Sequence, residues 1–174
     1  MNTNKRNTKK KKSNMVLVYI GIIVVLLVGI FAMGKLEKDN VLYNKPAGEL
    51  NTATRQLLND PNYQNIILPE ELDQKIEEKE DFVVYMFSAS CNYCKQTTPE
   101  IMPIVNELGM DLPQFNLLEF PKYQEKYGVE YTPTLIAFED GVEVERLVGG
   151  IVADGSPEGA TLSDFRTFFE KYNK

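Results

Sequence analysis

The 174-residue sequence contains no histidine. This absence removes histidine as a general acid, general base or nucleophile, and it removes every zinc or haem site that needs a histidine ligand. Cysteine is almost absent as well, because the chain has only Cys91 and Cys94. A framework of several disulfide bridges is therefore excluded.

Basic residues are scarce over most of the chain. The first 34 residues carry six of the nineteen Lys and Arg and none of the 25 Asp and Glu, so the remaining residues have a net charge of −12. Binding to nucleic acid requires a clustered basic face, and an acidic body of this kind is not expected to provide one. With 43% hydrophobic and 25% charged residues, the composition predicts one globular domain of modest size.

The N-terminus divides into a basic tail, residues 1–14, and an uncharged run, Met15–Met33. Nineteen helical residues span roughly the 30 Å hydrocarbon core of a bilayer. The run therefore predicts a transmembrane anchor. The alternatives are a buried core helix and a cleaved secretory signal, for which Ala32-Met33-Gly34 is the candidate cleavage site.

Charge predicts the orientation of this anchor. Basic residues precede it and the flank after it is balanced, so the N-terminus is expected to stay cytoplasmic. The run Lys9–Lys12 is interpreted as a topogenic signal, with a nucleic-acid contact as the alternative. The acidic body is then expected outside the membrane, where disulfides can persist, in an arrangement that suits a bacterial envelope.

Residues 34–65 show a weak pattern, with a short helix predicted over Glu49–Leu58. They are interpreted either as a spacer behind the anchor or as an extension packed on the domain. Residues 66–174 alternate strands with helices, which predicts a layered α/β domain with a mixed sheet. The predicted strands are 65–68, 81–87, 113–118, 134–138 and 142–148, the last two joined by a hairpin turn at Asp140-Gly141, and the predicted helices begin at Pro69, at the cysteines, at Pro121 and near Thr161.

Cys91 and Cys94 stand three residues apart, directly after the predicted strand 81–87. A zinc, iron–sulfur or haem site is excluded because the chain has no further cysteine and no histidine to complete the ligand set. Two inert core thiols and a redox pair remain, and the position favours the redox pair. At the N-terminus of a helix, free N–H groups and the helix dipole stabilise a thiolate. Cys91 is therefore the candidate attacking thiolate, and Cys94, one turn later, is the candidate resolving thiol.

The segment Val83–Pro99 (VVYMFSASCNYCKQTTP) resembles the strand, CxxC site and kinked helix of the thioredoxin superfamily. A second segment, Tyr127–Gly150, is similar to the family's cis-proline region and last hairpin, and the resemblance extends over residues 66–174. It implies a thioredoxin fold, with a cis peptide bond at Thr132-Pro133 facing the cysteines. It also implies that Thr132 and Pro133 hold the backbone of an extended substrate. Tyr93 is a further candidate for substrate binding, with simple packing beside the disulfide as its alternative.

The chain departs from the family pattern at three places. Tyr85 occupies the position of a buried acid, Ser90 that of an aromatic residue, and Asn92-Tyr93 that of Gly-Pro. Without the acid, a mixed disulfide is expected to be released more slowly. Tyr93 and Thr132 look more like the corresponding residues of extracytoplasmic disulfide isomerases and oxidases.

Together these features predict a membrane-anchored thiol–disulfide oxidoreductase that works outside the cytoplasmic membrane, as an oxidase or isomerase or as a dedicated reductant. Its expected partners are protein thiols and disulfides, a membrane-embedded redox protein, and the lipid bilayer through residues 15–33. No cofactor, metal or nucleic acid is expected. The alternative is a tethered binding module, or an accessory to bacteriocin or peptide export, with a thioredoxin fold and a mainly structural disulfide.

Overall fold

The computed structural model describes residues 8–34, 39–152 and 159–173. In the first helix, it describes the side chains from residue 15 to residue 31, so those of the basic tail lie outside the description. The chain divides into two compact units, Met1–Lys38 and Asp39–Lys174.

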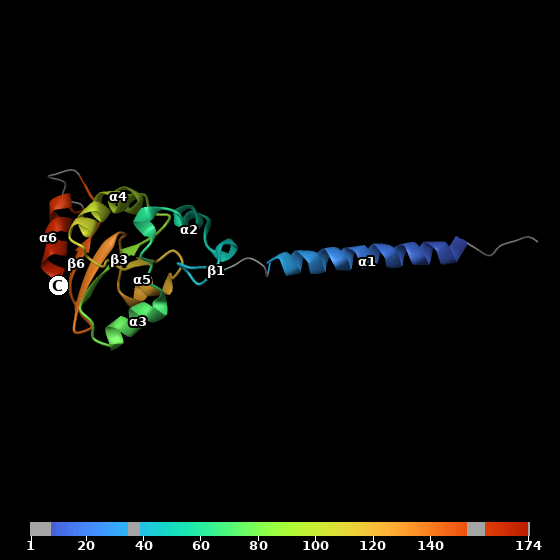
Figure 1. Ribbon diagram of the computed structural model, residues 1–174, viewed down its shortest axis with the longest axis horizontal. Helices are drawn as coiled ribbons and strands as arrows, with labels where there is room; N and C mark the ends of the chain where they lie inside the picture. Colours follow the sequence, from blue (N-terminus) through green and yellow to red (C-terminus); the bar gives the residue numbers. More distant parts are fainter. Residues whose placement is uncertain (1–7, 35–38, 153–158, 174) are drawn as a thin grey trace, which may run out of the picture. The chain divides into compact units, whose positions relative to one another are not determined.

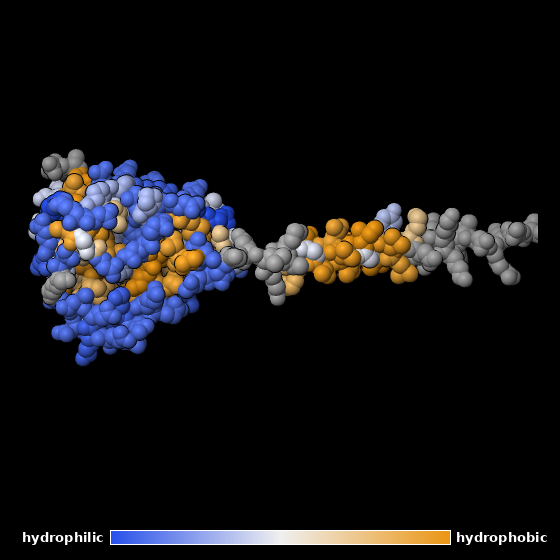
Figure 2. Space-filling model, in the orientation of Figure 1, coloured by the Kyte–Doolittle hydropathy of each residue, from blue (hydrophilic) through white to orange (hydrophobic). Residues whose placement is uncertain are grey.

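The first unit contains helix α1 (Thr8–Gly34; Figure 1). Large hydrophobic side chains are exposed along Met15–Phe31 (Figure 2). Within the part of the chain that the structure describes, none of the helices combines the length and the apolarity that crossing a membrane requires. The helix predicted over residues 15–33 is confirmed, and the membrane span predicted for it is not.

The second unit is built on a four-stranded mixed sheet with the strand order β4-β3-β5-β6. Strand β3 (Phe82–Phe87) pairs in parallel with β4 (Gln114–Asn116) and antiparallel with β5 (Thr134–Glu139), which pairs antiparallel with β6 (Val142–Val148). The turn Asp140-Gly141 joins the last two strands with φ of 52° and 74°, as a type I′ hairpin requires. The predicted mixed sheet and hairpin are confirmed.

Helices cover both faces of the sheet (Figure 1). Because side chains alternate along a strand, β3 contributes to two cores: Val83, Tyr85 and Phe87 enter one, and Val84 and Met86 enter the other. Helices α4 (Asn92–Glu107) and α6 (Leu162–Tyr172) pack on the first core, and α3 (Pro69–Glu77) and α5 (Lys122–Lys126) pack on the second. This burial on both faces explains why β3 is apolar at every position.

Local chemistry explains where the helices begin. Pro69 occupies the first turn of α3, where its missing N–H costs nothing. At the start of α6, Thr161 and Asp164 cap each other: the Asp164 N–H donates to Thr161 Oγ1 at 3.2 Å, and the Thr161 N–H donates to Asp164 Oδ2 at 2.8 Å. Both predicted starts are confirmed.

The strand predicted over residues 65–68 is wrong. Only Ile66 forms a bridge, parallel to Gln114, and the Ile67 N–H donates to the Gln114 carbonyl at 3.0 Å. The pairing stops there because Pro69 has no N–H to continue a ladder and already belongs to α3.

Residues 39–63 belong to the same compact unit as the sheet. Tyr43, Leu50, Thr54 and Tyr63 are buried, so these residues adopt the packed arrangement, the second of the two interpretations left open by the sequence. Their elements are the short strands β1 (Asp39–Asn40) and β2 (Lys45–Pro46), the 3₁₀ turns η1 (Ala47–Glu49) and η2 (Pro61–Tyr63), and helix α2 (Thr52–Leu57).

Candidate active site

Cys91 is the N-cap residue of α4, directly after the loop that follows β3. Its backbone N–H donates to the Ser88 carbonyl at 3.0 Å, which closes a turn in that loop. Its Sγ accepts a hydrogen bond from the backbone N–H of Cys94 at 3.3 Å. A helix N-terminus presents free N–H groups, and here one of them points at the sulfur, as the sequence predicted.

The surroundings of Cys91 stabilise its thiolate. Partial burial raises the pKa of Cys91, but hydrogen bonds from the Thr132 side chain and the Cys94 backbone outweigh that effect, and the pKa lies below its usual value. When protonated, the thiol can donate to the Thr132 carbonyl, which lies 3.2 Å from Sγ. Cys91 is partly exposed, so a thiol with a lowered pKa is also within reach of a partner.

Cys94 has the opposite environment. Its side chain is fully buried, and burial raises its pKa to about 12, although the Ser88 backbone acts in the other direction. Because only the thiolate is nucleophilic, burial and a raised pKa disfavour Cys94 as a nucleophile toward outside reagents, whereas its lowered pKa and partial exposure favour Cys91. Within the described part of the chain, both cysteines are free thiols.

Hydroxyl groups form the floor beneath Cys94, which consists of Tyr63, Tyr85 and Thr98. Thr98 Oγ1 donates to the Cys94 carbonyl at 2.8 Å, and the Tyr63 hydroxyl donates to the same carbonyl at 3.4 Å. The Tyr85 hydroxyl lies 3.0 Å from Thr98 Oγ1. Burial raises the pKa of Tyr85 well above 10, so this phenol stays protonated and cannot act as the base that a buried carboxylate would provide.

The peptide bond Thr132-Pro133 is cis, as the resemblance implied. Thr134 Oγ1 donates to the Tyr131 carbonyl at 2.7 Å and ties this loop to the start of β5. The Thr132 carbonyl faces Cys91, whereas the Thr132 N–H has no hydrogen-bond partner among the described residues. The structure therefore brings Cys91, Thr132 and Pro133 together.

Two hollows lie near the start of the cysteine helix. One, of about 390 Å³, is lined by Cys91 and Thr132 and has polar walls that include Ser88, Gln124 and Glu130. The other, of about 680 Å³, is lined by Tyr93, Tyr131, Val148 and neighbouring glycines. Tyr93 is 60% exposed and Tyr131 67% exposed, so both rings are accessible to a partner chain.

Gly150 brings the end of the sheet against the cysteine helix. A Cβ at this position would lie 2.8 Å from Thr97 Oγ1 and 3.1 Å from Tyr93 Cβ. The same Thr97 hydroxyl accepts a hydrogen bond from the Ile151 N–H at 2.9 Å. Only glycine permits this close approach. Gly150 also lines the hollow that contains Tyr93 and Tyr131.

Sequence reasoning missed several residues of this site. Thr98 carried a detectable signal, since it stands four residues after Cys94 on one helix and a threonine there can bond the earlier carbonyl. Tyr63 carried none, because it reaches the site from a distant segment. Tyr131 directly precedes the predicted pair Thr132-Pro133, but its exposure beside Tyr93 could not be read from the sequence. Within the described residues, no three Cys, Asp or Glu side chains are placed to hold a metal ion.

A CxxC pair at the start of a helix, facing a cis-proline loop on a mixed α/β sheet, defines a thiol–disulfide oxidoreductase of the thioredoxin type. Comparison with known proteins gives the family: the thioredoxin sequence profile matches residues 64–155. The chain belongs to the thioredoxin family.

The relatives carry two kinds of name. The chain is 39% identical to a thioredoxin of Chlamydia muridarum over 72 residues, which are 38% of this chain and 67% of that protein. It is 29% identical over 92 residues, 51% of this chain and 70% of the other, to a disulfide bond formation protein of Brevibacillus choshinensis. Among solved structures, the thioredoxin of Malassezia sympodialis has the same fold, with a TM-score of 0.51 at 16% identity over 63% of this chain and 92% of that one.

Proposed function

We propose that the domain exchanges disulfides with protein substrates, with Cys91 attacking and Cys94 resolving. The observation that carries this proposal is the contrast between a partly exposed Cys91 with a lowered pKa and a buried Cys94 with a raised one. In the reducing direction, the Cys91 thiolate attacks a substrate disulfide, forms a mixed disulfide and releases one substrate thiolate. The Cys94 thiol then passes its proton to the departing substrate sulfur and attacks Cys91 Sγ, which closes the intramolecular disulfide and releases the second substrate sulfur as a thiol.

The substrate chain lies along the cis-proline loop. The free Thr132 N–H is positioned to pair with an extended backbone, beside Pro133 and within reach of Cys91 Sγ. Tyr93, on the exposed side of the helix N-terminus, contacts the residues that flank the substrate cysteine.

The proposed direction is oxidation of substrate thiols, in which the Cys91–Cys94 disulfide is passed to the substrate, or isomerisation of substrate disulfides. Stabilising the Cys91 thiolate stabilises the reduced enzyme, which makes its disulfide a stronger oxidant. A dedicated reductant is the second candidate, and the higher identity to thioredoxins favours it. The reduction potential distinguishes the two, near −270 mV for a thioredoxin-like reductant and near −120 mV for a strong oxidant.

The proposed location is the outer face of the cytoplasmic membrane. This rests on the uncharged sequence Met15–Met33 and the basic residues before it, and it implies a membrane-embedded redox partner that resets the cysteines. Cell fractionation tests it: the full chain should resist extraction from membranes by alkaline carbonate, and its domain should be cleaved by protease added outside spheroplasts. Recovery in the soluble cytoplasmic fraction would contradict it.

Trapping tests the chemistry. A Cys94→Ser variant should accumulate mixed disulfides through Cys91 in cells, because the attack proceeds and the resolving thiol is missing. Reducing agent should release the captured substrates. If the variant is abundant and captures nothing, the disulfide is structural, and the tethered binding or export-accessory function replaces the exchange function.

A further inference from the structure

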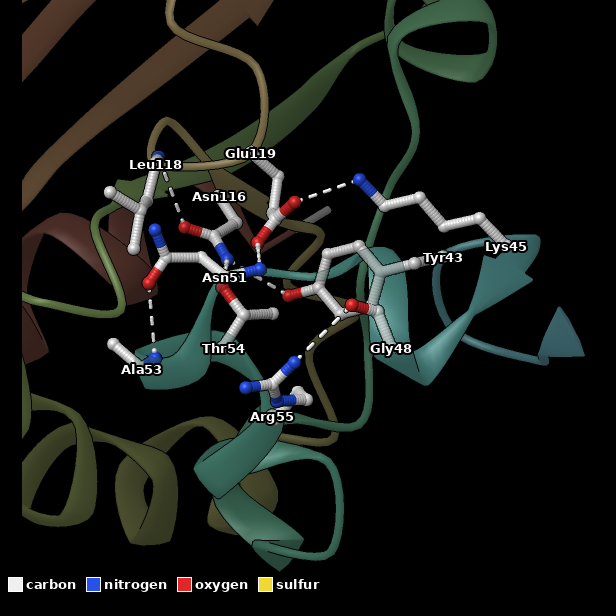
Figure 3. Close-up of polar contacts among 10 residues, drawn as sticks. All are labelled: Tyr43, Lys45, Gly48, Asn51, Ala53, Thr54, Arg55, Asn116, Leu118 and Glu119. Atoms are coloured by element: carbon white, nitrogen blue, oxygen red, sulfur yellow. Dashed lines mark hydrogen bonds and ion pairs between the residues drawn. The ribbon is translucent and has the colours of Figure 1, made fainter. Parts of the chain in front are cut away.

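The segment Asp39–Tyr63, here called the extension, lies before the part of the chain that matches the family profile, residues 64–155. It nevertheless belongs to the same compact unit as the sheet. Tyr43 and Thr54, which are 6% and 0% exposed, direct their hydroxyl groups inward to one residue of the sheet, Asn116 (Figure 3).

Asn116 uses its whole hydrogen-bonding capacity in this place. Its Nδ2 donates to the hydroxyls of Tyr43 and Thr54, both at 3.1 Å. Its Oδ1 accepts from the backbone N–H of Ala89 at 3.3 Å and of Leu118 at 3.2 Å. An amide offers two donors and two acceptor positions, so these four bonds fix the orientation of the side chain.

The position of Asn116 links the extension to the cysteine loop. Asn116 is the last residue of β4 and lies beside Phe87, the last residue of β3. Ala89, which it holds, stands in the short loop between β3 and Cys91. The neighbouring Ser88 accepts from the Cys91 N–H at 3.0 Å, and its own backbone acts on the Cys94 thiol.

Two further contacts secure the extension. Glu119, whose side chain is 5% exposed, binds Lys45 Nζ and the Asn51 N–H, each at 2.8 Å (Figure 3). At the end of the extension, the Tyr63 hydroxyl donates to the Cys94 carbonyl, and the Tyr63 ring lies 5.1 Å from that of Phe87. The extension thus reaches the active site at both sides of the CxxC pair.

We propose that the extension is a working part of the active site, and that Asn116, held by Tyr43 and Thr54, is the positioning residue for the loop Ser88–Ser90. This inference rests on Cys91 being the attacking thiol. When the loop is held, the Cys91 sulfur stays aligned with the N–H groups at the start of α4. When it is released, the sulfur samples positions away from those groups, and its thiolate loses stabilisation.

The test compares full-length variants in the reduced state. Asn116→Leu removes all four hydrogen bonds at similar volume, and Tyr43→Phe combined with Thr54→Val removes only the two from the extension. The rate of alkylation of Cys91 by iodoacetamide is measured against pH. Both variants should move the inflection upward, by about half a pH unit for Asn116→Leu, which reduces the rate near neutral pH about threefold.

Two control variants separate positioning from general stability. Thr54→Ser keeps the hydroxyl and should retain the unaltered profile. Tyr123→Phe removes a hydroxyl that donates to Asp73 at 2.7 Å on the other face of the sheet, so it should lower the free energy of unfolding and leave the profile unchanged.

The inference is overturned if the double variant unfolds more easily but its alkylation profile coincides with that of the unaltered protein. The double variant decides the question if Asn116→Leu does not fold. A shift of the alkylation inflection between the variants and the unaltered protein reports the positioning of the loop. An ordinary thiol pKa for Cys91 in the unaltered protein would instead refute the exchange function.

Discussion

Cys91 and Cys94 are one helical turn apart, yet they occupy two contrasting regions. Around Cys91 lies a rim of accessible groups, formed by the half-buried Thr132 and the exposed rings of Tyr93 and Tyr131. Around Cys94 lies the buried floor of hydroxyl groups. The same functional group therefore has a lowered pKa at the rim and a raised pKa above the floor. The comparison shows that the surroundings of two identical side chains give them different roles, attack for Cys91 and resolution for Cys94.

The largest effect is expected from replacing the Cys91 thiol with a hydroxyl group. Cys91→Ser should abolish turnover of a protein disulfide, a loss of at least about a thousandfold, because a hydroxyl is almost never ionised at neutral pH. Cys94→Ser should also stop turnover but should form a mixed disulfide, visible as a shifted band on a non-reducing gel. Equal trapping by both variants would erase the proposed division of labour.

The second effect concerns the stability of the reduced protein at high pH. The folded pKa of Cys94 is raised to about 12, so its contribution to stability is complete below the unfolded pKa and is lost as the pH rises. From pH 9 to 10 Cys94 alone should lower the free energy of unfolding by about 1 kcal/mol. Urea unfolding of Cys94→Ala should show a slope that is shallower by this amount, because the buried tyrosines with raised pKa values are retained and still contribute. A slope as steep in the variant as in the unaltered protein would assign the whole effect to other groups.

The third effect tests whether the exposed ring of Tyr131 contributes to substrate binding. Tyr131→Ala should raise the KM for a protein substrate about fivefold and leave the alkylation of Cys91 unchanged, since an exposed ring of this size contributes about 1 kcal/mol to an interface. The matched control is Val144→Ala, which alters an exposed side chain on β6 outside both hollows. Equal effects of the two substitutions would remove Tyr131 from the binding surface.

The smallest effect is expected at the floor. Tyr85→Phe removes one buried hydrogen bond and should lower the free energy of unfolding by about 1 kcal/mol. Turnover should stay within about a factor of two, because a phenol with a pKa far above neutral does not exchange protons in the reaction. Steady-state rates across pH 6–9 measure this. A large fall in rate with a displaced pH optimum would make Tyr85 a participant in proton transfer.

Local sequence predicted much of this molecule. The apolar strand before the cysteines, the proline and capping starts of α3 and α6, and the hairpin at Asp140-Gly141 each depend on a few neighbouring residues. Cys91 as an N-cap follows from the strand and helix on either side of it. The strand predicted over residues 65–68 failed, because pairing depends on a distant partner and on the helix that begins at Pro69.

The extension and the floor could not be predicted in the same way. Tyr43 and Thr54 meet Asn116 across 73 and 62 residues of sequence, and no periodic pattern marks them. Their hydroxyl groups are ordinary in composition and acquire a role only from where the chain places them. The cis bond at Thr132-Pro133 was expected from resemblance to a family and not from the two residues themselves.

The sequence by itself determined that two thiols would stand at the start of a helix behind a buried strand, because strand and helix formation are governed by neighbours within a few residues. Only the tertiary structure decided how far each thiol is buried, which loop faces it and which hydroxyls support it. Burial and electrostatic stabilisation depend on every group within a few ångströms, and most of those groups come from elsewhere in the chain.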